Sequence, residues 1–187
     1  MAYNNSKGRS ISMRPEAANQ RSEYGHWEID TVVGGKGTNP ACLLVLTERM
    51  AREQVIRKIA SKSQKAVVRA LNQIEREDDS IFNKLKTITA DNGCEFLNIE
   101  GIERSVDNKK KRCDLFFAHP YTASERGSNE NANRIVRRFI PKGVDISCYS
   151  KARIQEIEDW MNTLPRKLLK GLSAKQKVKQ YFMENAA

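Results

Sequence analysis

The sequence has no long hydrophobic run and no paired-cysteine motif, and each absence excludes a class of protein. No stretch reaches 18 apolar residues, and the N-terminus lacks the apolar core of a secretion signal, so we expect a soluble, cytoplasmic protein with no membrane partner. The four cysteines are scattered without a C-x-x-C pair, which argues against a zinc ribbon or a redox dithiol. Aromatic residues make up only 7% of the chain, a share that is low but adequate for one globular core.

Positive charge is what the sequence has in excess. Across 187 residues, 33 Lys and Arg outnumber 23 Asp and Glu, which gives a net charge of +10. Such a surplus favours polyanionic partners, because each neutralised phosphate releases condensed counterions. We expect nucleic acid rather than a membrane surface, since no basic amphipathic anchor stands out. The alternative is that the charge only aids solubility.

Hydrophobic patterning predicts one α/β domain over residues 24–187, after a polar, flexible arm over residues 1–23. The predicted strands cover residues 25–33, 41–47, 53–60, 86–90 and 114–118. The predicted helices cover residues 61–78, 129–139, 151–163 and 173–183, and residues 98–111 are predicted to form a weak helix and a charged loop. This order indicates a five-stranded mixed sheet, three antiparallel strands followed by two parallel ones, flanked by helices. That is the ribonuclease-H-like arrangement.

Four acids stand at positions where chemistry is plausible. Asp30 interrupts an apolar strand, where an isolated carboxylate resists burial unless it is paired or binds a metal, although an outward-facing acid explains it equally well. Asp91 ends the fourth strand, where ligand crevices form, and the alternative is an ordinary turn acid. Glu125 and Glu130 flank Gly127, and Ser128 or Asn129 can cap the helix that follows; favourable interaction with the helix dipole accounts for either glutamate.

Taken together, the acids suggest metal chemistry. An acid in the first strand, one after the fourth strand and one opening a late helix can converge on a single sheet edge. Mg²⁺ takes oxygen ligands and keeps positions for phosphate and water. Two such ions can clamp the attacking and leaving oxygens of a phosphoryl displacement. A basic protein with this cluster is expected to cut or join nucleic acid.

Three motifs carry a resemblance to a known family. The segments 25–30 (GHWEID), 88–96 (ITADNGCEF) and 117–131 (FAHPYTASERGSNEN) resemble the DDE catalytic core of bacterial insertion-sequence transposases, most closely the IS-thirty family within the retroviral-integrase superfamily. The resemblance runs from about Ile11 to the C-terminus. It implies that residues 24–187 form an integrase-like catalytic core with C-terminal helices, and that Asp30, Asp91 and Glu130 are the catalytic residues and metal ligands.

The same resemblance implies a function and its partners. Mg²⁺ or Mn²⁺ in a two-metal site would support attack by water at the ends of a transposon, followed by attack of the freed 3′-OH on target DNA. Double-stranded DNA would be the partner of a homo-oligomer associated with the bacterial nucleoid. No covalent protein–DNA intermediate is expected.

The chain departs from the family pattern at a few positions. Ser124 stands where the family usually has Trp, and Arg134 replaces a small residue. The segment that begins at Ser173 differs from the sequence with which the family usually starts its last helix. None of these touches the acids. The family's N-terminal helix-turn-helix region has no counterpart here, so we expect an excised catalytic fragment or a truncated product.

Several polar residues are candidates for DNA contact, each with a structural alternative. They are His119, Arg126, Asn131, Asn133, Arg134, Arg137 and Arg138. His119 could instead order its loop, and either asparagine could orient the acid beside it. We interpret His26 as structural, Glu28 and Glu95 as structural or as supports for the proposed acids, and residues 109–112 (KKKR) as a solvated loop. Two rival functions stay open: a nuclease of the same fold that only hydrolyses, and a non-catalytic DNA-binding or assembly module.

Overall fold

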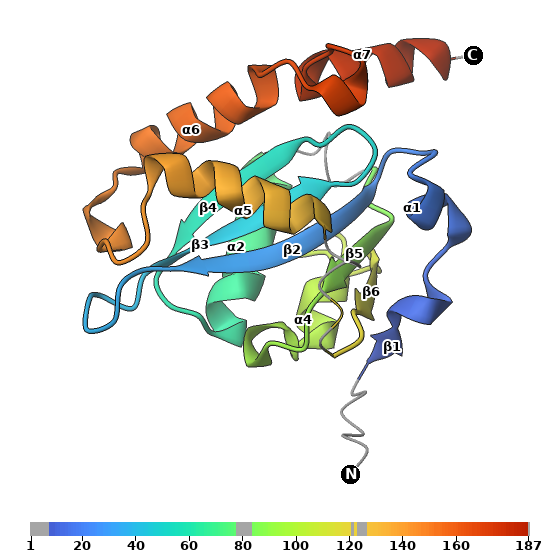
Figure 1. Cartoon of the computed structure of the whole chain (residues 1–187). Helices are drawn as coiled ribbons and strands as arrows, with labels where there is room; N and C mark the ends of the chain where they lie inside the picture. The colour runs from blue at the N-terminus through green and yellow to red at the C-terminus, as the bar shows by residue number, and fades with distance from the viewer. Residues whose placement is uncertain (1–7, 78–83, 121, 123–126, 187) are drawn as a thin grey trace.

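A mixed β-sheet lies between two layers of helices in the computed structural model, which describes residues 8–77, 84–120, 122 and 127–186 (Figure 1). The sheet has six strands in the order β1-β6-β5-β2-β3-β4. Their bounds are β1 Arg9–Ser10, β2 His26–Val33, β3 Cys42–Glu48, β4 Gln54–Ile59, β5 Thr87–Ala90 and β6 Asp114–Phe117. The α/β class and the ribonuclease-H-like arrangement predicted from the sequence are confirmed, with one strand more than expected.

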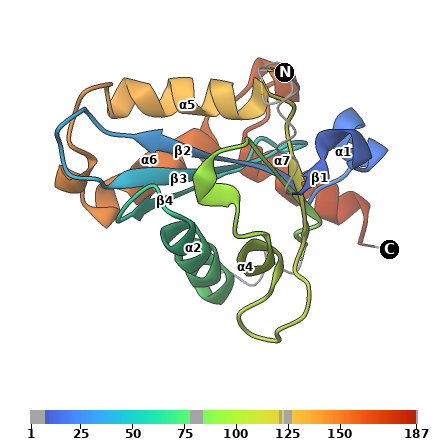
Figure 2. The same cartoon turned by 90° about the horizontal axis from the view of Figure 1, so that it is seen from below.

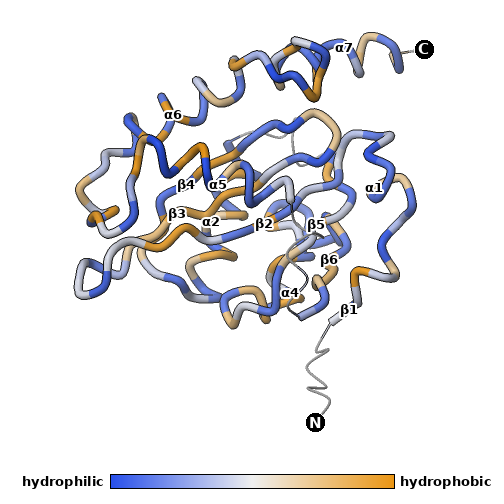
Figure 3. The backbone as a smooth tube through the Cα atoms, viewed as in Figure 1, coloured by the Kyte–Doolittle hydropathy of each residue, from blue (hydrophilic) through white to orange (hydrophobic). Residues whose placement is uncertain are grey.

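The pairing pattern agrees with the predicted topology. Strands β2, β3 and β4 form an antiparallel meander, and β5 and β6 join in parallel beyond β2. Strand β3 is buried at every position, as expected for a continuous apolar run that is covered on both faces. Hydrophobic residues concentrate on the central strands (Figure 3).

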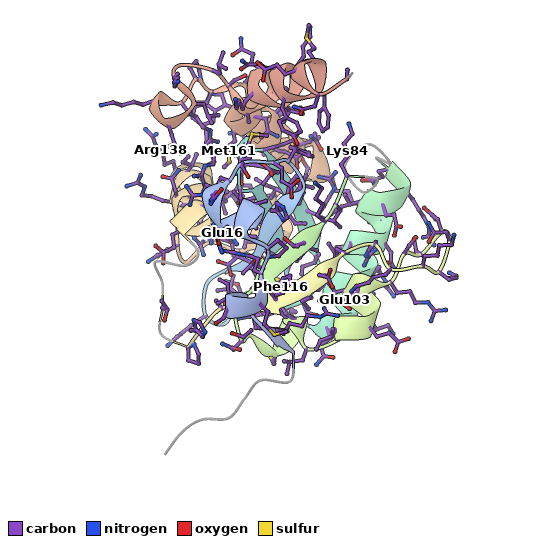
Figure 4. All side chains as sticks on the ribbon, turned by 90° about the vertical axis from the view of Figure 1, so that its right-hand side faces the viewer. Glu16, Lys84, Glu103, Phe116, Arg138 and Met161 are labelled. Atoms are coloured by element: carbon purple, nitrogen blue, oxygen red, sulfur yellow. The ribbon has the colours of Figure 1, made fainter. Side chains whose placement is uncertain are left out.

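The additional strand comes from the segment that the sequence predicts to be a flexible arm. Within residues 8–23 the chain forms β1, a 3-10 turn η1 (Ile11–Met13) and the short helix α1 (Glu16–Gln20). Strand β1 pairs in parallel with β6, and Ile11 and Ala18 are buried. The arm prediction fails here because these contacts are made with residues about 100 positions away. Figure 4 views this side of the molecule, with Glu16 of α1 and Phe116 of β6 labelled.

Period-two alternation along β2 separates two hydrophobic cores. Trp27 and Ile29 point into the larger core with helix α2 (Gln64–Glu77), whereas Val32 points to the opposite core with helices α5 (Gly127–Phe139) and α6 (Lys151–Thr163). Figure 2 shows α2 and α4 (Ile99–Glu103) on one side of the sheet and α5 on the other. Asp30 shares the parity of Val32 and therefore lies on the α5 side.

The remaining helices lie within a few residues of their predicted positions. Helix α7 (Ala174–Glu184) begins with a capping box in which Ser173 and Gln176 exchange hydrogen bonds with each other's backbone N–H groups, so the unusual residues here still start a helix well. The weak helix and charged loop predicted over residues 98–111 are confirmed, since α4 ends at Glu103 and a loop follows. No helix of the described ranges is both long and apolar enough to cross a membrane.

Candidate active site

Strand register brings the first two acids to neighbouring strands. Parallel pairing of β2 with β5 sets Trp27 opposite Ile88 and Glu28 opposite Thr89. Continued by two residues, the same register sets Asp30 level with Asp91, and neighbouring strands lie about 4.8 Å apart. The two carboxylates therefore come together through sheet geometry.

A tight turn holds Asp91 at the end of β5. Its Oδ1 accepts a hydrogen bond of 2.9 Å from the N–H of Gly93, and the side chain of Asn92 donates to the carbonyl of Ala118 at 2.9 Å. A Cβ on Gly93 would stand 2.8 Å from Asp91 Oδ1 and 2.5 Å from Glu95 Oε2, so only glycine fits without displacing a carboxylate. The Asn92–Gly93 turn thus fixes the position of the Asp91 carboxylate.

Glu130 reaches the same place from helix α5, in whose first turn it lies. The start of this helix is tied to the sheet by Glu28, which is fully buried, pairs with Arg49 and accepts a 2.9 Å hydrogen bond from the N–H of Asn129. Burial lowers the pKa of Arg49, and the negative charge of Glu28 partly offsets this shift. These contacts agree with a supporting role for Glu28, because they fix the helix that carries Glu130.

The helix begins earlier than predicted, at Gly127. Ser128 and Asn129 consequently lie within the first turn instead of capping it. Ser128 Oγ receives a hydrogen bond from Arg52. The side-chain amide of Asn129 is buried, and neither its oxygen nor its nitrogen has a partner among the residues that the structure describes.

The three acids line one open hollow of about 540 Å³. Its other lining residues include Asn129, the Asn92–Gly93 turn and His119. Asp30 is half-buried and Glu130 is exposed, so solvent and a large substrate can reach the carboxylates. The three acids that the sequence singles out thus line the same hollow.

Asp30 is oriented by two hydrogen bonds. Its Oδ1 accepts from the N–H of Thr31 and its Oδ2 from the side-chain amide of Asn133, each at 2.8 Å. The sequence suggests that Asn133 could orient Glu130, its neighbour in the chain, whereas this contact is made with Asp30. Thr31 in turn donates to Glu95 at 2.8 Å, a buried acid that also pairs with Lys62, so Glu95 has structural partners as expected.

The chemistry of the donors fits a hard divalent cation, although no three acidic, His or Cys side chains in the described ranges stand close enough to form a ready-made cage. Mg²⁺ typically takes one or two carboxylates and completes its shell with water and phosphate. Carboxylates on three separate elements, with an unsatisfied buried amide at Asn129 beside them, suit a site that a substrate helps to complete.

The predicted DNA-contact residues divide into two groups. Asn131, Arg134 and Arg138 are exposed on α5, and Arg134 donates to Asn131 at 2.8 Å. Arg137 instead turns back to the chain, donating to the carbonyls of Val33 and Pro141. Arg126, Glu125 and Ser124 lie outside the described residues.

The two histidines and the basic loop also have defined surroundings. His119 Nε2 hydrogen-bonds the hydroxyls of Ser10 and Ser12, so the N-terminal segment helps to order this side of the hollow. His26 is buried between Thr87 and Glu23, as a structural residue should be, and burial lowers its pKa. The solvated-loop prediction is wrong for Arg112, which is buried and paired with Glu75 because the loop folds back onto α2.

Sequence reasoning missed three groups of site residues. The serines of β1 and η1 and the buried Arg52 have no local signal, because their positions depend on contacts distant in the chain, and the sequence suggests Asn129 only as a helix cap. Only the position of Asn129 next to Glu130 in the motif could have drawn attention to it.

Comparison with known proteins gives consistent names. No protein-family model matches the sequence. The chain is 38% identical over 169 residues to a "Probable transposase for insertion-like sequence element IS1161" of Streptococcus salivarius, covering 90% of this chain and 46% of that protein. It is 35% identical to the "Transposase for insertion sequence element IS4351" of Bacteroides fragilis (94% and 51% covered), and 29% identical to "Transposase InsI for insertion sequence element IS30C" of Escherichia coli K12 (90% and 42%). The chain thus spans about half the length of the curated relatives it matches.

Proposed function

This chain is a homologue of the insertion-sequence transposases, the IS30 type among them, and from that premise we propose that it is the catalytic core of a DDE transposase. In this proposal it cleaves DNA at the ends of a transposon and joins the freed 3′-OH to target DNA. One observation carries the proposal: Asp30, Asp91 and Glu130, from three separate elements, line one solvent-open hollow.

Mg²⁺ or Mn²⁺ would be held by Asp30, Asp91 and Glu130, and such ions supply Lewis-acid stabilisation of the charge that develops at a phosphate. The protein's own contribution is to hold the acids in place. Asn133 and the Thr31 N–H fix the two oxygens of Asp30, and the Gly93 N–H fixes one oxygen of Asp91. These contacts would keep like charges close together before substrate arrives.

DNA would reach the hollow along α5. The exposed Asn131, Arg134 and Arg138, together with Arg126, would contact the phosphate backbone, and His119 would face the DNA from the other rim. Transposition brings two element ends together, so we propose a homo-oligomer on double-stranded DNA as the active complex.

The first test uses labelled duplexes that end in the terminal sequence of the encoding element, incubated with the protein and Mn²⁺ or Mg²⁺. We expect metal-dependent cleavage and, with a precut 3′-OH end, a strand-transfer product. Glu130→Gln should abolish both at unchanged fold, because it removes a charged ligand without changing size. Glu100→Gln, an exposed acid on α4, is the matched control and should retain activity.

The outcomes separate the rivals. Retained cleavage in Glu130→Gln would overturn the assignment, and a loss of equal severity in Glu125→Gln would mean that the other glutamate is the ligand. Hydrolysis without strand transfer would favour the nuclease. DNA binding with no metal-dependent product, and with no Mn²⁺ binding that depends on Asp30 and Asp91, would favour the assembly module.

A further inference from the structure

A second hollow lies on the other side of the first turn of α5, and every charged residue in its lining is a cation. It measures about 460 Å³, and its charged lining consists of Arg21, Arg52, Arg166 and Lys167. None of these four forms a salt bridge with a carboxylate anywhere in the described part of the chain. Four like charges around one hollow repel one another unless an anion joins them.

Arg52 is the centre of this arrangement. Only 7% of its surface is exposed, its guanidinium donates to Ser128 Oγ, and its Nε has no hydrogen-bond partner within the described ranges. Burial, and then the charge of Arg21, lower the pKa of Arg52 to about 10. The nearest acids are engaged elsewhere, because Glu28 pairs with Arg49 and Glu48 accepts backbone N–H groups.

Arg166 repeats the pattern from the loop after α6. Its Nε is also buried without a partner in the described structure, while one of its terminal nitrogens donates to the carbonyl of Met161 at 3.0 Å. Both arginines line one hollow and each has an unpartnered Nε–H, and the planar guanidinium fork matches the paired oxygens of a phosphate or a carboxylate.

The backbone at Arg52 supports a role for its side chain. Arg52 turns the β3–β4 connection with a φ of 63°, a left-handed conformation that costs most residues about 1–2 kcal/mol and that glycine or asparagine adopts more easily. An arginine at such a position points to a role that depends on its side chain.

From this geometry we infer that the hollow binds a phosphodiester group of the DNA backbone next to the reacting one. The inference rests on the proposed DNA-processing function. Gly127, Ser128 and Asn131 of α5 line the basic hollow, and Asn129 and Glu130 line the acidic one. A strand crossing the first turn of α5 thereby sets one phosphate at the acids and another between the arginines.

The test measures the affinity of the 187-residue chain for fluorescent duplex DNA over a series of salt concentrations. Loss of one phosphate contact reduces the slope of log K against log[salt] by about 1 and weakens binding equally for all sequences. We expect this result for Arg166→Gln and for Arg21→Gln. Arg69→Gln removes an exposed cation from α2 on the opposite face of the sheet, and it should leave the slope unchanged.

Arg52→Lys is the more stringent variant, because it keeps the charge but loses the planar fork. We expect it to weaken DNA binding as well, provided that its circular dichroism and melting match the parent. If it does not fold, the Arg166 and Arg21 variants decide the matter. Parental slopes in both of these variants would overturn the inference while leaving DNA binding by the protein intact.

A titration with inorganic phosphate, followed by NMR at the arginine Nε–H groups, separates this inference from the proposed function. Shifts at Arg52 and Arg166, together with DNA binding by the parent, support a backbone phosphate site. Shifts without any DNA binding would mean that the hollow takes free phosphate, which overturns its assignment to DNA. Absence of shifts and unchanged slopes would leave no anion site at all.

Discussion

At the scale of residues, two buried glutamates hold segments of the backbone in place through hydrogen bonds from N–H groups. Glu28 and Glu48 lie on neighbouring strands and are both fully buried. Glu28 has an arginine partner, whereas Glu48 accepts hydrogen bonds from backbone N–H groups, among them those of Gly25 and Ala51. A carboxylate satisfied by dipoles alone remains costly to ionise in the interior, and its protonation should therefore be visible in the stability of the fold.

Glu48 should make the protein less stable as pH rises. Burial raises the pKa of Glu48 from its ordinary value of 4.5 to about 7. Between these values the unfolded chain releases the proton first, so the free energy of unfolding falls as pH increases. We expect the parent to lose on the order of 2–3 kcal/mol relative to Glu48→Gln between about pH 4.5 and 7.5.

Urea unfolding of both proteins across this pH range measures the effect. If the amide of Glu48→Gln fails to make one of these hydrogen bonds, the free energy of unfolding of the variant falls by the same amount at every pH, so its pH dependence does not change. Glu100→Gln, whose side chain is 82% exposed, serves as control and should run parallel to the parent. A constant difference between Glu48→Gln and parent would show that Glu48 does not titrate in this window.

At the scale of elements, the N-terminal segment belongs to the domain. It adds a sixth strand, and Arg14 of this segment donates to Thr89 at 3.0 Å while Arg49 reaches back to the carbonyl of Ala18 at 2.8 Å. These bonds join the segment to β5 and to the residue pair that anchors α5. Chain that precedes the first long strand thus packs against the side of the sheet that carries the candidate site.

Two neighbouring residues of η1 test this integration. Ile11→Ala should cost about 2–4 kcal/mol of unfolding free energy, because Ile11 is 6% exposed and leaves a cavity. Met13→Ala removes a side chain that is 68% exposed and should change stability by less than about 0.5 kcal/mol. Equal, small effects in denaturant melts would mean that the segment is an arm after all.

At the scale of the whole molecule, the surplus of ten positive charges is partly organised. Some cations form ion pairs in the interior, as Arg49 and Arg112 do with buried glutamates. Others gather around the start of α5: Arg21, Arg166 and Lys167 line the basic hollow, and Arg134 and Arg138 are exposed on the helix itself. An organised field of this kind favours an extended polyanion over a diffuse anionic surface.

Binding to a random-sequence duplex should therefore be strong at low salt and fall steeply as salt increases. With about six phosphate contacts, affinity should drop by about 10³-fold between roughly 50 and 200 mM salt. Anionic phospholipid vesicles, measured by sedimentation in parallel, should bind less at every salt concentration. Equal binding to vesicles, or salt-independent binding to DNA, would contradict a role for this charge in nucleic-acid recognition.

Local pattern was sufficient for much of this protein. The alternation of Trp27, Ile29 and Val32, the apolar run of β3 and the spacing in α2 are short-range signals, and they predicted the mixed sheet and its helices. The order of the elements predicted that acids from a first strand, a strand end and a late helix could converge, and the family resemblance of their motifs selected Asp30, Asp91 and Glu130.

Other features were decided only by tertiary structure. The pairing of β1 with β6, the burial of Arg112 and the clustering of Arg21, Arg52 and Arg166 join residues that are far apart in the chain. No local pattern distinguishes a solvated arginine from one that packing encloses, because burial depends on which distant element arrives to cover it. The acids could therefore be read from their motifs, whereas the cations that would hold the DNA beside them required the fold.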